Sequence, residues 1–181
     1  MVRLGGDERA WVRGAQAGSA SDLEALVRAF WPGAFRAAFL VVRDAALAED
    51  IAQEAFLAAL RSLERFDRRR PFGPWLHRIV VNRAIDAVRA RSLRRELSDE
   101  LVAEAPAAAP GGNPGGGLAE ETAAALARLP AEQRAVIVLR HLLGYTPGEI
   151  AELLGLPRGT VNSRLRRGLD ALAGTLEQEE P

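Results

Sequence analysis

The C-terminal third of the chain places apolar residues at the spacing of two short helices joined by a turn. Thr146 and Glu149 have the spacing of a capping box at the start of the first helix, and Pro147 suits its first turn. Gly155 tolerates the left-handed backbone of a tight turn, after which Pro157 can open the second helix. This pattern predicts a helix-turn-helix, whose second helix enters the major groove of DNA. The apolar face of its first helix comprises Ile150, Ala151, Leu153 and Leu154.

The second helix of this pair has an apolar side and a polar side. The apolar side is formed by Val161, Leu165, Leu169 and Leu172. The polar side carries arginines, which can contact guanine edges or phosphates, with short polar residues between them. A solvated arginine face would look similar, but it would not account for the capped helix and the turn that precede it. We therefore expect contacts to duplex DNA from Asn162, Ser163, Arg166 and Arg167.

The N-terminal half of the chain predicts three further helices. The first opens at Ser21, which has the spacing of a capping box with Glu24, and it is expected to kink or break near Pro32. The second runs over about residues 45–63 and the third over about residues 74–95, with a basic loop between them. The first turns of the second helix expose an acidic edge, which water alone can satisfy: Glu49, Asp50, Gln53 and Glu54.

The third of these helices is apolar around most of its circumference. Its remaining polar side chains form a narrow stripe, which consists of Arg78, Asn82, Asp86 and Arg89. Just before the stripe, aromatic residues flank three arginines: Phe66, Phe72 and Trp75 lie next to Arg68, Arg69 and Arg70. Aromatic rings among arginines can hold unstacked bases and follow a single-stranded backbone. The alternative is that the rings belong to the core and the arginines to a solvated loop.

A segment rich in proline, glycine and alanine divides the chain. Residues 106–117 can bury little and favour neither helix nor strand, as is typical of a flexible linker. We therefore predict an all-α fold of two small helical domains joined by this linker. The boundaries are an N-terminal tail at 1–19, a first domain at 20–96, the linker at 97–117, a second domain at 118–177 and a tail at 178–181.

The charges are unevenly placed along a chain whose formal net charge is zero. Residues 61–95 hold eleven arginines against three acidic residues, and residues 158–167 hold four arginines and no acidic residue. Two separate basic segments suggest two contacts with one polyanion. The absence of lysine is explained more simply by a GC-rich genome than by a need for bidentate phosphate contacts.

The sequence disfavours several classes of protein. Without cysteine there is no disulfide framework, thiolate metal site or cysteine nucleophile. No lysine follows the glycine-rich residues 111–117, which excludes a P-loop, and His77 and His141 lack metal-ligand spacing. We expect no enzyme activity, no cofactor and no metal. The N-terminus has no apolar signal core and the apolar runs are too short to cross a bilayer, so we expect a cytoplasmic protein without membrane insertion.

Two groups of motifs resemble the sigma factors that direct bacterial RNA polymerase to promoters. Region 2 of that family is matched by residues 50–56, 72–79 and 82–86. Region 4 is matched by residues 129–134, 149–151 and 159–165. Two regions and a linker, in this order, are similar to the small extracytoplasmic-function (ECF) class.

The resemblance implies a role for each exposed polar surface. Region 2 would dock on core RNA polymerase through Asp50, Gln53 and Glu54. Region 4 would read the −35 promoter element as duplex DNA through the second helix of the helix-turn-helix. The residues that the resemblance assigns to this contact are Thr160, Asn162, Ser163, Arg166 and Arg167, with phosphate contacts from Arg158 and Arg164. An anti-sigma protein often holds family members inactive and is a further expected partner. Region 2 would also capture an extruded base of the non-template strand at the −10 element, through Phe66, Arg68, Arg69, Arg70, Trp75, Arg78, Asn82 and Arg89.

Two departures from the family pattern leave the promoter sequence open. The loop from Phe66 to Phe72 is short and rich in arginine, and Asn162 stands where many members have a basic residue. The alternative interpretation is a stand-alone regulator that binds duplex DNA and dimerises through its N-terminal helices. That alternative explains the C-terminal half but not the polar stripe beside the aromatic residues, and polymerase binding distinguishes the two.

Overall fold

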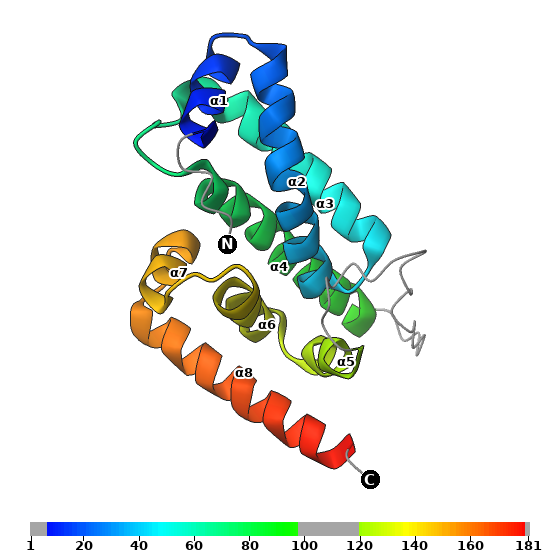
Figure 1. Ribbon diagram of the computed structural model, residues 1–181. Coiled ribbons are helices and arrows are strands. Elements are labelled where there is room, and N and C mark those ends of the chain that lie inside the picture. The colour runs from blue at the N-terminus through cyan, green and yellow to red at the C-terminus, as the bar shows by residue number, and fades with distance from the viewer. Residues whose placement is uncertain (1–6, 98–119, 180–181) are drawn as a thin grey trace.

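The computed structural model describes residues 7–97 and 120–179, which form helices joined by short turns and contain no strand (Figure 1). The predicted all-α fold is confirmed for these residues, whereas almost all of the predicted linker lies outside them. The elements are α1 (Asp7–Gln16), α2 (Ala20–Val42), α3 (Ala45–Ser62), the 3₁₀ turn η1 (Leu63–Arg65), α4 (Phe72–Leu97), α5 (Glu120–Arg128), α6 (Ala131–Ile137), the π-helical turn η2 (Val138–Leu142), α7 (Pro147–Leu154) and α8 (Arg158–Glu179).

Helices α1–α4 form the first packed unit, with α2 at its centre in contact with the other three. Alanines at 34 and 37 are fully buried on α2, which lets neighbouring helices approach closely. Leu40 of α2 and Leu76 and Val80 of α4 fill the remaining space. The apolar residues of the N-terminal half therefore form one helical core.

Two details of α2 differ from the prediction. Ser19 is the N-cap instead of Ser21, and its hydroxyl oxygen accepts a hydrogen bond of 3.3 Å from the Asp22 backbone N–H. The helix also continues through Pro32 to Val42 without the expected break. Pro32 is exposed while the turns on both sides of it are packed, and this tertiary packing outweighs the one backbone hydrogen bond that a proline removes.

Helix α1 lies within the segment that the sequence assigned to a tail. It packs along α2 and buries Val12. The turn that joins the two helices contains Gly18 with φ of +88°, a left-handed conformation that glycine adopts without strain. Gly14 lies so close to α2 that a Cβ at this position would be 1.8 Å from the Asp22 carboxylate. The first unit therefore begins before residue 20.

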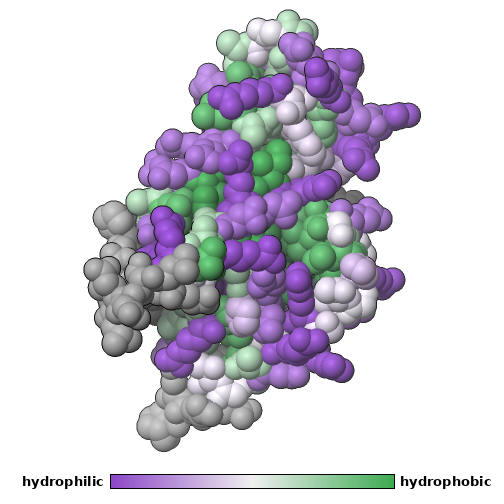
Figure 2. Space-filling model, turned by 180° about the vertical axis from the view of Figure 1, so that it is seen from behind, coloured by the Kyte–Doolittle hydropathy of each residue, from purple (hydrophilic) through white to green (hydrophobic). Residues whose placement is uncertain are grey.

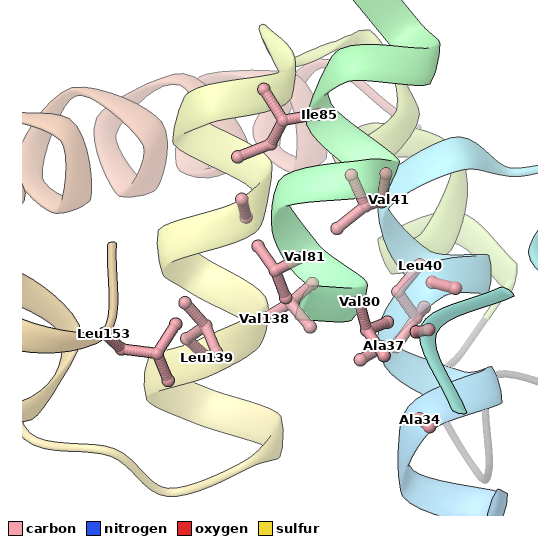
Figure 3. Packing of buried hydrophobic residues seen from close by; sticks show 14 of the residues in the cluster. Ala34, Ala37, Leu40, Val41, Val80, Val81, Ile85, Val138, Leu139 and Leu153 are labelled. Carbon is pink, nitrogen blue, oxygen red and sulfur yellow. The ribbon is translucent and has the colours of Figure 1, made fainter. Parts of the chain in front are cut away.

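Helices α5–α8 form a second unit that packs directly on the first (Figure 1). Helix α6 contacts α8 on one side and α2 and α4 on the other. Val138 and Leu139 of η2 lie between Val81 of α4 and Leu153 of α7, and all four side chains are buried (Figure 3). The buried residues of both units form one continuous apolar cluster.

The surface of the described residues is mostly polar. Hydrophilic side chains project over much of the face drawn in Figure 2, with hydrophobic ones visible between them. The large apolar side chains that remain exposed in the described part are Leu57, Leu93 and Leu169.

Among the described helices, only α2 is long and apolar enough to cross a membrane by length and composition. The sequence alone suggested apolar runs too short to span a bilayer, whereas the continuous helix α2 is long enough. A helix at the centre of a core passes the same test, and α2 contributes eight buried residues to this one. The position of α2 at the centre of the core therefore explains its apolar composition.

Candidate nucleic-acid interface

The helix-turn-helix has the local geometry that the sequence predicts. The Thr146 hydroxyl accepts a hydrogen bond of 3.3 Å from the Glu149 backbone N–H, and the Glu149 carboxylate accepts one of 2.7 Å from the Thr146 backbone N–H. Hydrogen bonds to the Glu149 carboxylate from the Thr146 backbone N–H and from the Thr146 hydroxyl (2.8 Å) hold the pKa of Glu149 below its ordinary value. Gly155 ends α7 in the left-handed conformation, with φ of 65°. The predicted capping box and turn are both confirmed.

Helix α8 packs on α6 and α7 through most of its predicted apolar side. Val161, Leu165 and Leu172 are buried, but Leu169 is 41% exposed. Gly168 faces α6 in its place, and a Cβ on Gly168 would be 2.7 Å from the Ile137 Cδ1 atom. Because Gly168 takes the position that faces α6, Leu169 lies outside the interface.

The outer side of α8 carries the residues predicted to contact duplex DNA. Thr160 and Ser163 are half-buried, and the Ser163 hydroxyl donates a hydrogen bond of 3.0 Å to the Thr160 carbonyl oxygen. Arg164 is also half-buried, since it lies towards α6. The side chains left exposed to solvent belong to Arg158, Asn162, Arg166 and Arg167.

The polar stripe on α4 is exposed along its full predicted length, with Arg78, Asn82, Asp86 and Arg89 all open to solvent. The three arginines before α4 are exposed as well. Phe66, in contrast, is only 8% exposed, and its ring centroid lies 4.5 Å from that of Trp75 and 5.9 Å from that of Phe72. Phe66 is therefore a core residue in this arrangement and does not offer its ring to a base, whereas Trp75 keeps part of its surface open.

The acidic edge of α3 borders a groove between α3 and α4. Asp50, Gln53 and Glu54 are exposed, and the Glu54 carboxylate forms an ion pair of 2.5 Å with Arg83 of α4. The groove has a volume of about 350 Å³, an apolar floor and charged rims; it is lined by Leu47, Asp50, Ile51, Glu54, Arg83, Asp86 and Ala87. A groove of this kind can receive a helix that carries apolar and basic side chains.

Comparisons with known proteins identify both units. The family model for Sigma-70 region 2 matches residues 26–94, and the model for Sigma-70 region 4 matches residues 119–172. The ECF RNA polymerase sigma factor SigL of Mycobacterium tuberculosis is 34% identical over 169 residues, which cover 92% of this chain and 96% of that protein. The chain belongs to the ECF class of RNA polymerase sigma factors.

Further relatives agree with this assignment. The ECF sigma factor SigW of Bacillus subtilis is 34% identical over 136 residues, 69% of this chain and 73% of that protein. The structure of CnrH in complex with the cytosolic domain of CnrY has a TM-score of 0.72 at 27% identity and covers 96% of this chain and 99% of that one. The sigma factor RpoE in complex with the anti-sigma factor NepR from Bartonella quintana shares the fold, with a TM-score of 0.73 at 24% identity over 89% of this chain and 100% of that one.

Membership of this family confirms the sigma-factor interpretation, and the stand-alone regulator is not favoured. Sigma factors are not enzymes. Within the described residues of this sigma factor, no group of three or more His, Cys, Asp or Glu residues could hold a metal ion.

An ion pair joins region 2 to region 4 of this sigma factor. Arg89 on the polar stripe of α4 lies 2.6 Å from the Glu132 carboxylate of α6. Burial acts to raise the pKa of Glu132, but a hydrogen bond from its own backbone N–H, a hydrogen bond from Arg89 and the charges of Arg89 and Arg164 together hold it below its ordinary value. Arg89 is therefore occupied by region 4 in this arrangement.

Arg134 is a second link between the regions, and sequence reasoning gave it no role. Its guanidinium is buried and donates hydrogen bonds to the Val41 carbonyl oxygen of α2 and to those of Ala127 (2.6 Å) and Leu129 (2.8 Å). Burial, with the nearby charge of Arg43, lowers the pKa of Arg134 to about 10. The sequence signal available for Arg134 was its position within residues 129–134, the motif that resembles region 4.

His77 is the third link. Its Nδ1 atom shares a hydrogen bond of 2.7 Å with the Tyr145 hydroxyl of region 4, and burial lowers its pKa to about 4. His77 thus packs in the core, while His141 is exposed.

Proposed function

We propose that this sigma factor binds polymerase and reads its promoter through three separate surfaces. The acidic edge of α3 docks on core RNA polymerase. The loop before α4 and the polar stripe on α4 bind the −10 element as single-stranded DNA. The outer side of α8 reads the −35 element as duplex. The observation that carries the proposal is that exposed polar residues gather on α3, on α4 with the loop before it, and on α8, while the apolar sides of these helices form the core.

The −35 surface has the chemistry of major-groove readout. Arg166 and Arg167 can each place two N–H donors on a guanine edge, and Asn162 can pair with adenine. Arg158 stands at the N-terminus of α8, where the helix dipole favours a phosphate. Because all four of these side chains are exposed on one helix, they can reach one groove together.

The −10 surface combines charge with an open polar stripe. Melting costs a few kcal/mol for each base that leaves the stack, and contacts to the single strand offset part of that cost. Arg78 and Asn82 offer donors to an extruded base, and the arginines at 68–70 can follow its backbone. Trp75 supplies the partly open ring beside them.

The groove between α3 and α4 supports the polymerase assignment, because its floor is apolar and its charged rims include Asp50 and Glu54. This docking on RNA polymerase takes place in the cytoplasm. We also propose an anti-sigma protein as a regulator, since the similar fold of RpoE is found bound to the anti-sigma factor NepR.

The test separates the two DNA surfaces. Holoenzyme is assembled from core polymerase and the sigma factor, and a promoter is selected with the wild-type complex. Arg167→Ala should weaken binding to a −35 duplex probe by roughly 5- to 150-fold, the value of one bidentate base contact, and leave binding to a forked −10 probe unchanged. Asn82→Ala should do the reverse. Arg128→Ala, which changes an exposed arginine on α5, is the matched control. If both variants weaken both probes equally, the proposed division is wrong.

A further inference from the structure

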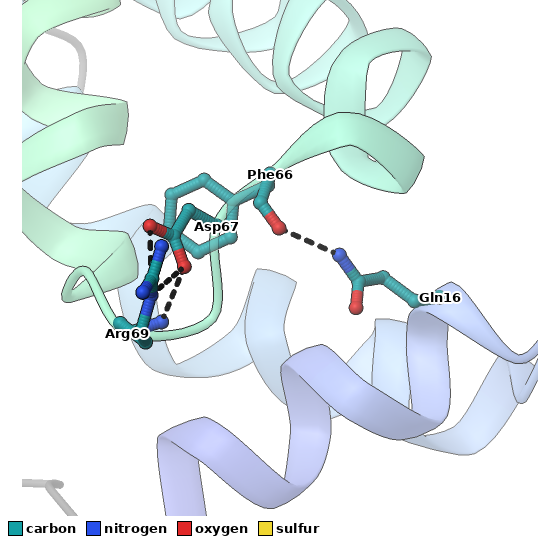
Figure 4. A network of polar contacts seen from close by, with 4 residues as sticks. All are labelled: Gln16, Phe66, Asp67 and Arg69. Carbon is teal, nitrogen blue, oxygen red and sulfur yellow. Dashed lines mark hydrogen bonds and ion pairs between the residues drawn. The ribbon is translucent and has the colours of Figure 1, made fainter.

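The loop that carries the three exposed arginines has little structure of its own. It spans residues 66–71, between η1 and α4, and is called the arginine loop below. Its internal contacts centre on Asp67, whose carboxylate accepts hydrogen bonds from the Arg69 backbone N–H (3.0 Å) and the Arg69 Nε atom (3.1 Å), as Figure 4 shows. The Arg70 backbone N–H donates to the Asp67 carbonyl oxygen at 2.9 Å. This turn shapes the middle of the loop but does not fix its ends.

Both ends of the arginine loop are held by α1. The Gln16 Nε2 atom donates a hydrogen bond of 3.0 Å to the Phe66 carbonyl oxygen (Figure 4). It donates another of 2.8 Å to the Leu63 carbonyl oxygen, so one side-chain amide closes the end of η1. At the other end, the Glu8 carboxylate accepts a hydrogen bond from the backbone N–H of Phe72, the first residue of α4. A carboxylate there also interacts favourably with the helix dipole.

The surroundings give these contacts a rigid base. Phe66, the first residue of the loop, and Phe72, which directly follows it, are buried in the aromatic cluster with Phe30 and Trp75. Helix α1 is itself fixed on α2 through buried Val12 and the close approach of Gly14 to Asp22. Contacts from α1 therefore hold the arginine loop at both of its ends.

We propose that α1 positions the arginine loop, with Gln16 and Glu8 as positioning residues that determine −10 selectivity without touching DNA. This inference rests on the proposed function of the loop. The family match to region 2 begins at residue 26, so α1 lies outside it. The loop arginines are long and flexible, so the backbone must be held for their side chains to favour one base sequence over another.

The test compares selectivity, which a loss of overall stability would not change. Holoenzyme containing Gln16→Leu, which keeps the size of the side chain but loses both donors, is assayed on forked probes with the selected −10 sequence and with single-base substitutions of it. We expect the ratio of affinities for selected and substituted probes to fall by on the order of fivefold, the loss of two hydrogen bonds. Binding to core polymerase and to the −35 duplex probe should not change. Gln133→Leu on α6, another half-buried glutamine, is the matched control.

Parallel variants of the loop keep the outcomes distinct. Arg68→Ala and Arg70→Ala test whether the loop reads the −10 element at all, and if neither changes the affinity ratio, both the proposed function of the loop and this inference fail. If the arginine variants change the ratio while Gln16→Leu and Glu8→Gln leave it at the wild-type value, the loop reads DNA but α1 does not position it, which overturns the inference alone. A uniform loss on all probes with Gln16→Leu also overturns it, because that result indicates a structural role only.

Discussion

His77 is a buried imidazole at the boundary between region 2 and region 4, and Tyr145 is its hydrogen-bond partner. Burial lowers its pKa from 6.5 to about 4, so the folded protein holds the neutral form. Burial first, and then the carboxylates of Glu149 and Glu8, raise the pKa of Tyr145, which therefore stays protonated. The unfolded chain binds a proton on His77 more tightly than the folded protein does.

Stability should therefore fall as the pH decreases from about 6.5 to about 4, by up to about 3 kcal/mol from this residue. His77→Gln keeps a hydrogen-bonding side chain but removes the titration. Urea unfolding of both proteins over this pH range measures the effect, since the carboxylates titrate in both and cancel in the difference. We expect the stability advantage of the wild type over the variant to shrink towards low pH. Parallel curves would show that His77 is not held neutral by the fold.

At the scale of single elements, the helix-turn-helix could be predicted because its signals are local. The capping box at Thr146 and Glu149 and the turn at Gly155 depend on a few adjacent residues. Helix α1 was not predicted, because half of its ten residues are charged or amide side chains and what stabilises it is the burial of Val12 on α2, a tertiary contact. The break predicted at Pro32 was wrong for the same reason, because tertiary packing keeps α2 helical on both sides of the proline.

Two glycines on α8 test how this helix is fixed. A Cβ on Gly168 would meet Ile137 at 2.7 Å, whereas a Cβ on Gly174 would meet nothing within 4 Å. Gly168→Ala should destabilise the protein by about 1–3 kcal/mol through overpacking. Gly174→Ala should stabilise it by about 0.5–1 kcal/mol, because alanine loses less backbone entropy in a helix. Thermal unfolding of the two variants checks the opposite signs, and shifts in the same direction would contradict the packing described here.

At the scale of the whole molecule, the sequence predicted two helical units but not how they meet. Apolar residues such as Leu139 and Val81 show that a surface is buried, yet their pattern does not say against which partner. The candidate sites follow the same division. Exposure of the acidic edge and of the polar stripe could be predicted from helix periodicity, whereas burial of Phe66 and the pairing of Arg89 with Glu132 depend on tertiary contacts.

Arg134 should be the strongest single link between the regions. Arg134→Met keeps much of the volume but leaves the three carbonyl oxygens at Val41, Ala127 and Leu129 without this donor. We expect a loss of about 2–4 kcal/mol in the free energy of unfolding and a larger radius of gyration in solution scattering. Arg61→Met, a change at an exposed arginine on α3, should cost less than about 0.5 kcal/mol. Equal losses in the two variants would mean that Arg134 does not join the regions.

Binding to core RNA polymerase tests whether this protein acts as a sigma factor through the acidic edge of α3. The wild-type protein is compared with Gln53→Ala/Glu54→Ala on the acidic edge of α3 and with Ser21→Ala/Glu24→Ala, a matched pair of exposed positions on α2. We predict tight binding by the wild type and the α2 control, and at least about tenfold weaker binding by the α3 variant. Equal binding by all three proteins would remove the proposed docking surface. Absence of wild-type binding to polymerase from the source organism would contradict the account as a whole.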